Sequence, residues 1–317
     1  MSMTFNDLPV EVISTIFKHT DFVSRMQLKL CNRMISAIVD RVEMDLDEVH
    51  LVAQDKPGPE KLELMIDNVT WKQMGSRNVE LKYHGRRKMI ILADPRATLL
   101  SIFQKIVINR TTRIQDIKII AEFPPEYERY SNLVKANEIH VFGMQWLNLF
   151  VPRCNSIRVA DHPATVSNTL EVPWTPLFSD ANSIHVIVPC NITDTQLINS
   201  NWHRMKFLET EITANGLNMM IRKWINENYG KGCGIQIYKR RGYQWRTIVD
   251  GLFYKKRILL DGDEEPVDEG IHIEIKMRNQ PFVVLLWSFD RDAWNISIQD
   301  KTADDQEEVC ITELPTM

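Results

Sequence analysis

The sequence predicts a fold that mixes helices and strands, of the α+β or α/β class. Short apolar runs with helical spacing fill residues 5 to 45, and farther along a pattern of the form small-Asn-x-Ile-x-Val occurs three times. The last quarter of the chain holds short apolar segments that alternate with period two. We therefore expect a small helical domain, then a strand-rich repeat region, then a C-terminal group of antiparallel strands.

Residues 5 to 45 are predicted to form three short helices. Asp7 can cap the first helix, and Pro9 suits its opening turn because that position needs no backbone N–H. A unit of about 40 residues is too small to bury all of its apolar surface, so exposed apolar side chains would form a partner-binding patch. The apolar face of the first helix comprises Leu8, Val12, Ile13, Ile16 and Phe17.

The linker from Asp55 to Glu60 interrupts regular structure. Pro57 and Pro59 flank Gly58 there, a combination that suits neither a helix nor a strand interior. We predict a helical domain at 1–50, a repeat region at 51–265, and a strand cap with a tail at 266–317.

The repeated pattern predicts a solenoid. It occurs at residues 136–141, 154–159 and 181–186, and related strands are expected at 114–120, 205–208 and 234–238. Equivalent apolar positions recur every 18 to 28 residues, the interval of a leucine-rich-repeat-like solenoid with one strand per unit. Residues 217–226 have the helical spacing expected of a return segment, and Thr193 can cap another. Because the leucine consensus is missing, the expected solenoid is irregular.

The C-terminal strands are expected to cap the repeats. Segments Ile271–Ile275, Phe282–Phe289 and Trp294–Ile298 are apolar or alternate, and turn-forming residues separate them. An antiparallel meander here would cover the open end of a stacked array.

The first helical segments resemble the F-box motif. Leu8-Pro9-Val10-Glu11-Val12 is followed by Leu28-Lys29-Leu30-Cys31, as in that family, although Met34 and Ile35 stand where many F-boxes carry an aromatic residue. The resemblance implies binding to a Skp adaptor and, through it, to a cullin that carries the ubiquitin-transfer machinery. The residues that the resemblance places at this contact are Leu8, Pro9, Val12, Ile13, Ile16, Phe17, Leu28 and Cys31.

Two later segments resemble the type-2 F-box-associated domain of the large nematode-expanded F-box family. They are Leu217–Asn226, with its Lys223-Trp224-Ile225 ending, and the aromatic-rich Tyr243–Gly251. This resemblance extends over most of the chain. It implies the substrate-recognition subunit of a Skp–cullin–F-box ubiquitin ligase, in which the repeat region binds a protein target.

Three basic clusters are candidates for contact with an acidic partner. Residues 82–88 interleave basic and aromatic side chains as a phosphate-binding strip does, whereas 239–241 and 255–257 could attract an acidic substrate or direct nuclear import. Solvated surface is the alternative for each. Since Arg, Trp and Tyr dominate binding hot spots, the predicted substrate-binding residues are Arg240, Arg241, Tyr243 and Trp245.

Catalytic and metal motifs are missing from the sequence. No pair of histidines or cysteines has metal-ligand spacing, and neither GxSxG nor a nucleotide-binding fingerprint occurs. The turn Asp261–Glu265 lacks the spacing of a calcium loop. We expect no cofactor, no metal and no catalysis by this chain.

The expected compartment is the cytoplasm or the nucleus. Five scattered cysteines without a CxxC pair fit a reducing environment, the N-terminus lacks a signal-peptide pattern, and apolar stretches such as Phe282–Trp287 are too short to cross a membrane. A formal net charge of -4 speaks against wholesale nucleic-acid binding.

Two alternatives stay open beside the ligase subunit. A plain interaction scaffold would bury Leu8, Ile13, Ile16 and Phe17 internally, whereas a receptor leaves several of them exposed. A nucleic-acid-binding repeat protein would bring the three basic clusters to one face.

Overall fold

The computed structural model of the protein divides into two compact units, Met1–Cys154 and Asn155–Met317. The domain limits predicted from the sequence, 1–50, 51–265 and 266–317, stay a prediction, because this division into two units does not test them. The structure describes residues 8–31, 33–54, 61–160, 169, 171–172, 175–227, 229–238, 243–252, 254–257, 271–276, 282–290 and 293–300.

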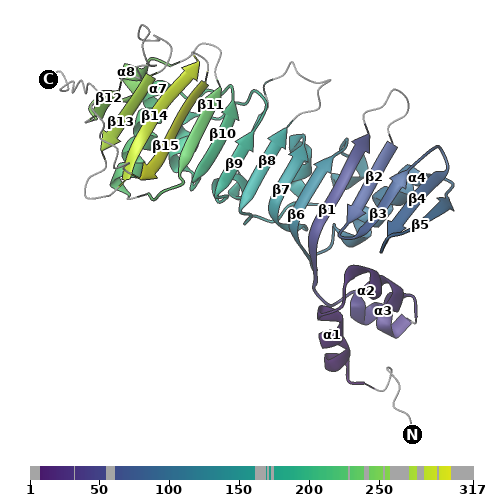
Figure 1. The fold of residues 1–317 in the computed structure, drawn as a ribbon. Helices are drawn as coiled ribbons and strands as arrows, with labels where there is room; N and C mark the ends of the chain where they lie inside the picture. Colours follow the sequence, from purple (N-terminus) through teal and green to yellow (C-terminus); the bar gives the residue numbers. More distant parts are fainter. Residues whose placement is uncertain are drawn as a thin grey trace. The chain divides into compact units, whose positions relative to one another are not determined.

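Three short helices open the first unit: α1 (Val10–Lys18), α2 (Phe22–Lys29) and α3 (Arg33–Val39) (Figure 1). Pro9 is the residue that caps α1, without a side-chain hydrogen bond, and Asp7 lies outside the described residues. Asp21 caps α2, where its carboxylate accepts a hydrogen bond from the Ser24 backbone N–H at 3.0 Å.

A mixed sheet forms most of the first unit, in the order β7-β6-β1-β2-β3-β4-β5. The strands β1 to β5 pair antiparallel with one another, whereas β6 runs parallel to β1, and β7 to β6. The strands are β1 (Met44–Gln54), β2 (Lys61–Ile66), β3 (Val69–Gln73), β4 (Asn78–Tyr83), β5 (Arg86–Ile91), β6 (Thr112–Ile120) and β7 (Lys135–Phe142).

Helix α4 (Pro95–Ile106) and two 3-10 turns, η2 (Pro125–Tyr127) and η3 (Met144–Leu149), accompany this sheet. Their aromatic side chains meet in the core, where the Phe103 ring lies 6.0 Å from that of Trp146. The buried polar atoms are paired: the Tyr127 hydroxyl donates to the Leu100 carbonyl at 2.7 Å, and the Trp146 indole N–H donates to the Ala121 carbonyl at 2.9 Å.

The second unit is also built on a mixed sheet, in the order β12-β13-β14-β15-β11-β10-β9-β8. Strands β8 to β11 are parallel, and β15 joins β11 antiparallel. The strands are β8 (Ser156–Ala160), β9 (Ser183–Val186), β10 (Arg204–Leu208), β11 (Gly234–Tyr238), β12 (Tyr254–Arg257), β13 (Ile271–Lys276), β14 (Phe282–Asp290) and β15 (Ala293–Asp300). The helices are α5 (Pro176–Ser179), α6 (Asp194–Asn199), α7 (Ala214–Asn226) and α8 (Trp245–Ile248).

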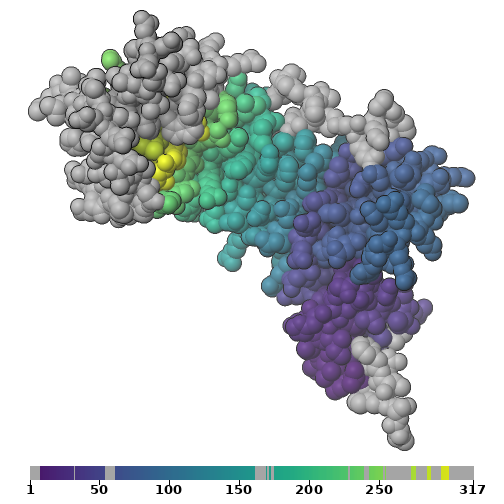
Figure 2. Space-filling model, in the orientation of Figure 1, coloured from purple at the N-terminus to yellow at the C-terminus, as the bar shows by residue number. Residues whose placement is uncertain are grey.

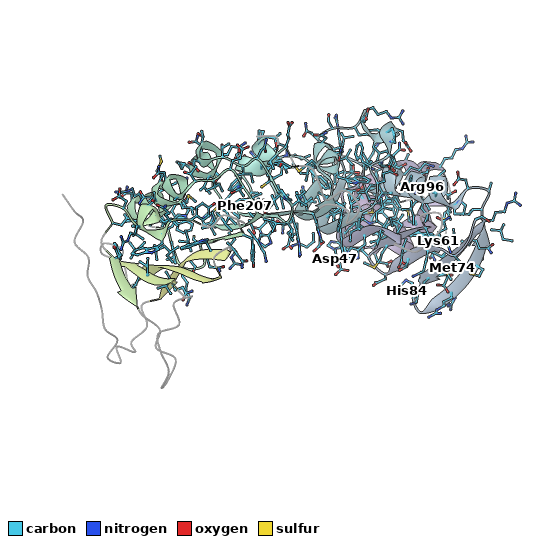
Figure 3. All side chains as sticks on the ribbon, turned by 90° about the horizontal axis from the view of Figure 1, so that it is seen from above. Asp47, Lys61, Met74, His84, Arg96 and Phe207 are labelled. Atoms are coloured by element: carbon cyan, nitrogen blue, oxygen red, sulfur yellow. The ribbon has the colours of Figure 1, made fainter. Side chains whose placement is uncertain are left out.

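Helices cover one side of the parallel strands in the second unit (Figure 3). Along β8 to β11 the residues of one face are buried, and those between them are half-buried or exposed. Phe207 belongs to the buried face, because its ring lies 5.8 Å from that of Trp202, whose indole N–H donates to the Phe178 carbonyl in α5.

The repeated motif has a structural explanation in this sheet. Its small residue is buried each time, at Ala136, Cys154 and Ala181. In two copies the asparagines connect adjacent strands: the Asn182 side-chain amide donates to the Asn155 side-chain carbonyl at 3.0 Å, and the Asn182 backbone N–H donates to the Asn155 backbone carbonyl at 3.1 Å. The motif therefore marks the start of a strand that follows a parallel neighbour.

The predicted leucine-rich-repeat-like solenoid is wrong. Strands of mixed direction follow the N-terminal helices, and antiparallel hairpins such as β2–β3 and β4–β5 lie where no strands were predicted. A solenoid needs one parallel strand from every unit and a return segment after it. Between β2 and β3 and between β4 and β5 a short turn sends the chain directly back, and the C-terminal strands extend the sheet through antiparallel β11–β15 pairing.

Candidate functional site

The three N-terminal helices enclose a small apolar core. Ile13 and Phe17 on α1 are both 0% exposed. They pack with Ile35, Ile38, Val39 and Val42, and the partly buried Leu8 and Leu28 lie against this cluster. Two of the predicted adaptor-binding residues, Ile13 and Phe17, therefore hold the helices together in this structure.

A second face of α1 is open. Val12 is 43% exposed and Ile16 is 39% exposed, and four-residue spacing makes them neighbours on the helix surface. Pro9 is also exposed. An internal scaffold would bury Leu8 and Ile16 together with Ile13 and Phe17, but Ile16 stays open and Leu8 only half-buried.

Further exposed apolar side chains follow α2. Leu30 is 87% exposed, and Met34 at the start of α3 is 45% exposed. Neither was among the predicted contact residues, although Leu30 belongs to the Leu-x-Leu-Cys segment. The predicted residue Cys31 is exposed, and its thiol lies 3.6 Å from the Gln27 carbonyl.

A buried arginine fixes α2 to the chain that leads into β1. Arg25 is only 3% exposed, and its guanidinium donates to the Thr20 carbonyl at 3.0 Å and to the Glu43 carbonyl at 2.9 Å. Burial lowers the pKa of Arg25 from its usual value. Spacing of apolar residues could not reveal this residue, because it is a charged side chain in a helix.

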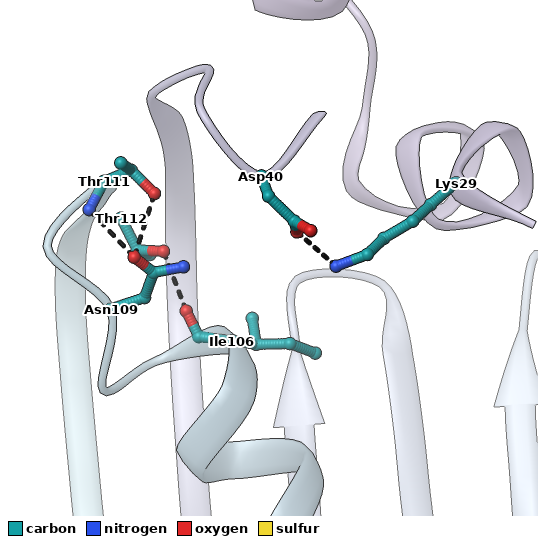
Figure 4. A network of polar contacts seen from close by, with 6 residues as sticks. All are labelled: Lys29, Asp40, Ile106, Asn109, Thr111 and Thr112. Atoms are coloured by element: carbon teal, nitrogen blue, oxygen red, sulfur yellow. Dashed lines mark hydrogen bonds and ion pairs between the residues drawn. The ribbon is translucent and has the colours of Figure 1, made fainter. Parts of the chain in front are cut away.

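A groove of about 410 Å³ borders these helices within the first unit. Its apolar lining includes Met26, Val39 and Ile106. At its polar margin Lys29 forms an ion pair with Asp40, and nearby the Thr112 hydroxyl donates to the Ile106 carbonyl at 2.7 Å (Figure 4). Since the ion pair is partly exposed, it contributes little to stability.

Residues 5–46 match the family model of the F-box domain. The N-terminal helices are an F-box. This domain fits, in general, a substrate adaptor of a Skp–cullin–F-box ubiquitin ligase, a type of subunit that is usually non-catalytic. A search of curated proteins and a search of solved structures found no match to the chain.

The resemblance to a type-2 F-box-associated domain stays a prediction, because the matched region covers the F-box alone. One of its segments forms α7, which begins after its cap Thr213, three residues earlier than expected. Trp224 is buried there, as expected of the apolar face of a return helix.

The predicted substrate-binding residues fall in two groups. Arg240 and Arg241 lie outside the described residues. Tyr243 is half-buried, and its hydroxyl donates to the Ile212 carbonyl at 3.0 Å, while burial raises its pKa. Trp245 is also half-buried, with its ring 6.0 Å from that of Tyr254. Tyr243 and Trp245 thus take part in local packing, and their role in binding stays a prediction.

The basic segment at 82–88 forms the β4–β5 hairpin. His84 and Gly85 have φ angles of 46° and 74°, as a tight two-residue hairpin turn requires. Its cationic side chains are exposed. Cluster 239–241 lies outside the described residues, as do the side chains of 255–257, so the predicted convergence of three clusters stays untested.

Two buried cysteines are held in an unreactive form, and no cluster of metal ligands occurs in the described part of the chain. Burial raises the pKa of the Cys154 and Cys190 thiols to about 12, which keeps both protonated and unreactive. Among the described residues no three His, Cys, Asp or Glu side chains gather as metal ligands. None of the helices described is long and apolar enough to span a membrane.

Proposed function

We propose that the chain is the substrate-recognition subunit of a Skp–cullin–F-box ubiquitin ligase, acting in the cytoplasm or the nucleus. Its F-box binds the Skp adaptor, and its strand-rich part holds a protein target. The adaptor contact consists of the exposed apolar residues of the F-box, with Val12 and Ile16 at its centre.

The observation that supports this proposal is the open face of α1. The helical core is complete without Val12 and Ile16, because Ile13 and Phe17 already fill it. Apolar side chains left open on so small a unit gain stability when a partner covers them, roughly 25 cal/mol for each Å² of apolar surface removed from water.

The contribution to ubiquitin transfer is proximity. A target held by this chain brings its lysine beside the ubiquitin thioester carried by other subunits, so that an encounter of separate molecules becomes effectively intramolecular. No acid, base or nucleophile of this chain is required for that step.

The test is adaptor capture by the full chain with Val12→Asp plus Ile16→Asp. Both carboxylates would be desolvated at the interface, so we expect adaptor affinity to fall at least about tenfold. Ile13→Asp is a poor choice, because it places a charge in the helical core and would unfold the F-box itself.

Met89→Asp plus Ile91→Asp is the matched control. These side chains are 55% and 79% exposed on β5, outside the F-box, and the double change adds the same charge. The proposal requires capture by the wild type and by this control. Failure of the wild type to bind the adaptor, or equal capture by the Val12/Ile16 variant, would refute it.

A further inference from the structure

The open face of the parallel strands in the second unit carries a line of basic side chains. Arg158, His185 and Lys206 are direct partners across neighbouring strands: Arg158 pairs with His185, and His185 with Lys206. These three residues are here called the basic row. Strands lie about 4.8 Å apart, so the row extends over roughly 10 Å.

No helix of the described residues covers this face, which turns toward the viewer in Figures 1 and 2. Arg158 is exposed, while His185 and Lys206 are half-buried. On each strand the neighbours of these residues point to the opposite, helix-covered side: Ile157, Ile184 and Phe207 are buried. The basic row is therefore accessible to a partner.

On the described strands β8 to β11, no carboxylate stands beside the basic row. The other outward positions on β8, β9 and β10 hold Ser156, Ala160, Ser183, Arg204 and Leu208. On β11 the positions that follow in the same sheet are Gly234, Gln236 and Tyr238. Within the described part of these four strands, no Asp or Glu neutralises the row.

The first unit shows the contrasting arrangement. There His50, Lys118 and His140 align in the same way across β1, β6 and β7. Two positions earlier on the same strands, however, a line of acids is present: Glu48, Asp116 and Glu138. An acidic line accompanies the basic one in the first unit, whereas the described strands β8 to β11 of the second unit carry only the basic one.

A charge on His185 would work against the stability of the sheet, because Arg158 and Lys206 stand directly opposite it on the neighbouring strands. Like charges directly opposite each other on neighbouring strands are destabilising. Burial is the main effect that lowers the pKa of His185, and the nearby Arg158, Lys206 and Arg204 lower it further. Charge pairing within the row therefore does not stabilise the sheet.

The cations are spread out rather than focused on one point. The Lys206 ammonium lies 5.6 Å from the centre of the Tyr238 ring, and the Arg204 guanidinium donates to the Gly232 carbonyl at 3.3 Å, both toward β11. Arg158 stands two strands away on β8. A distributed set of cations suits a run of carboxylates better than one compact anion.

We propose that the basic row binds an acidic, extended segment of a target protein, whose Asp and Glu side chains supply the missing carboxylates. This assignment names a substrate class and a surface for the proposed receptor function, on which it rests. Tyr238 and Leu208 flank the row and contact the apolar parts of the segment.

The experiment measures fluorescence anisotropy of a labelled peptide of alternating Glu and Gly on the full-length protein at low salt. A matched Gln–Gly peptide has the same length without charge. We expect the Glu peptide to bind, the Gln peptide to bind at least about tenfold more weakly, and the affinity to fall with added salt. Arg158→Gln plus Lys206→Gln should weaken the Glu peptide about tenfold.

Lys105→Gln plus Arg110→Gln is the charge-matched control. Both residues are exposed in the first unit, so the variant has the same net charge as the row variant and should bind normally. The row variant should stay folded, since both replaced side chains lie on the outward face of the sheet, and its unfolding curve verifies this. Equal binding of the Glu and Gln peptides, or a row variant that binds like its control, overturns the proposal.

A single-stranded oligothymidylate distinguishes the other class of anionic polymer. If it binds through the basic row more tightly than the Glu peptide, the site is for nucleic acid and the proposal is wrong. The adaptor-capture test uses other residues, so the two outcomes separate. If the protein fails the adaptor-capture test but still binds the Glu peptide through the basic row, only the receptor function is refuted. If it captures the adaptor but fails the peptide test, only the acidic-segment site is refuted.

Discussion

Neighbouring residues on α1 have opposite roles. Val12 and Ile13 are adjacent, as are Ile16 and Phe17, yet one of each pair is exposed and the other is fully buried. Helical spacing placed all four on a broad apolar face, but it could not separate the half that meets α3 from the half that stays open. That division depends on where α3 lies, which is tertiary information.

The packing of Phe17 predicts a large loss of stability on truncation. Phe17→Ala leaves a cavity in a cluster of only six buried residues, so we expect the F-box helices to lose about 3 to 5 kcal/mol of stability. Urea unfolding followed by circular dichroism measures the change. Ile16→Ala on the open face should cost less than about 1 kcal/mol, and equal losses for the two variants would contradict the assigned core.

His185 predicts a pH dependence of stability. Its surroundings lower its pKa in the folded state below the ordinary value of 6.5, chiefly through burial and then through Arg158, Lys206 and Arg204. As pH falls through about 6.5, His185 becomes protonated in the unfolded chain but stays neutral in the folded chain, so the folded state loses stability. Above that range this residue contributes no pH dependence.

His185→Gln isolates that contribution. Lowering the pH from about 7.5 to about 5.5 should reduce the urea midpoint of the wild type more than that of the variant. A bound acidic segment favours the charged imidazole, so peptide affinity should rise over the same pH decrease in the wild type alone. Parallel pH profiles for the two proteins would show that His185 is not the titrating group.

Two helices of the second unit are connected through their N-terminal caps. Thr193 and Gln196 form a capping box on α6, as the sequence suggested for Thr193. The next residue, Asp194, accepts hydrogen bonds from the Thr213 backbone N–H and hydroxyl, each at 2.7 Å. Thr213 in turn caps α7 by accepting from the Gly216 N–H at 3.2 Å. Side chains at one helix start thus position the next.

Gly216 shows that this arrangement requires close contact. A Cβ atom at that position would lie 2.0 Å from the Asp194 carboxylate oxygen and 2.3 Å from its carboxylate carbon. In an exposed helix Gly→Ala gains about 1 kcal/mol, but here the carboxylate must move and give up its bonds to Thr213. We expect Gly216→Ala to destabilise the protein by about 1 to 2 kcal/mol in urea unfolding.

Asn215→Ala is the control for that prediction. Asn215 is exposed in the same first turn of α7, so its replacement follows ordinary helix propensity and should leave stability unchanged or slightly higher. Should Gly216→Ala stabilise the protein as much as Asn215→Ala does, the contact with Asp194 is not tight in solution.

At the scale of the whole molecule, local patterns identified individual strands better than their arrangement. Alternation marked β8, β9, β10 and β11 correctly, because each has one buried face. The hairpins of the first unit were missed, although turn residues such as His84-Gly85 indicate one. Strand β1 pairs with β6, although the hairpins and α4 lie between them in the sequence. A local sequence pattern cannot predict which distant strand a given strand will pair with.

The candidate sites were likewise predictable only where their residues are close in the sequence. The F-box motif located the N-terminal site, because its residues are contiguous. The basic row was present in the sequence as the middle residue of Ile-Arg-Val, Ile-His-Val and Met-Lys-Phe. Only the register of β8, β9 and β10 shows that these three residues stand side by side.

The exposed hairpin of the first unit has a further consequence for the protein in concentrated solution. Strand β5 ends the strand order there, so along the described chain its outer backbone groups have no neighbouring strand. The unpaired backbone groups of an open edge strand can hydrogen-bond to the edge strand of a second copy, which starts aggregation. Arg86, Arg87 and Lys88 are exposed on β5, and two such edges repel each other. We therefore expect the basic strip at 82–88 to disfavour edge-to-edge self-association of the protein as well.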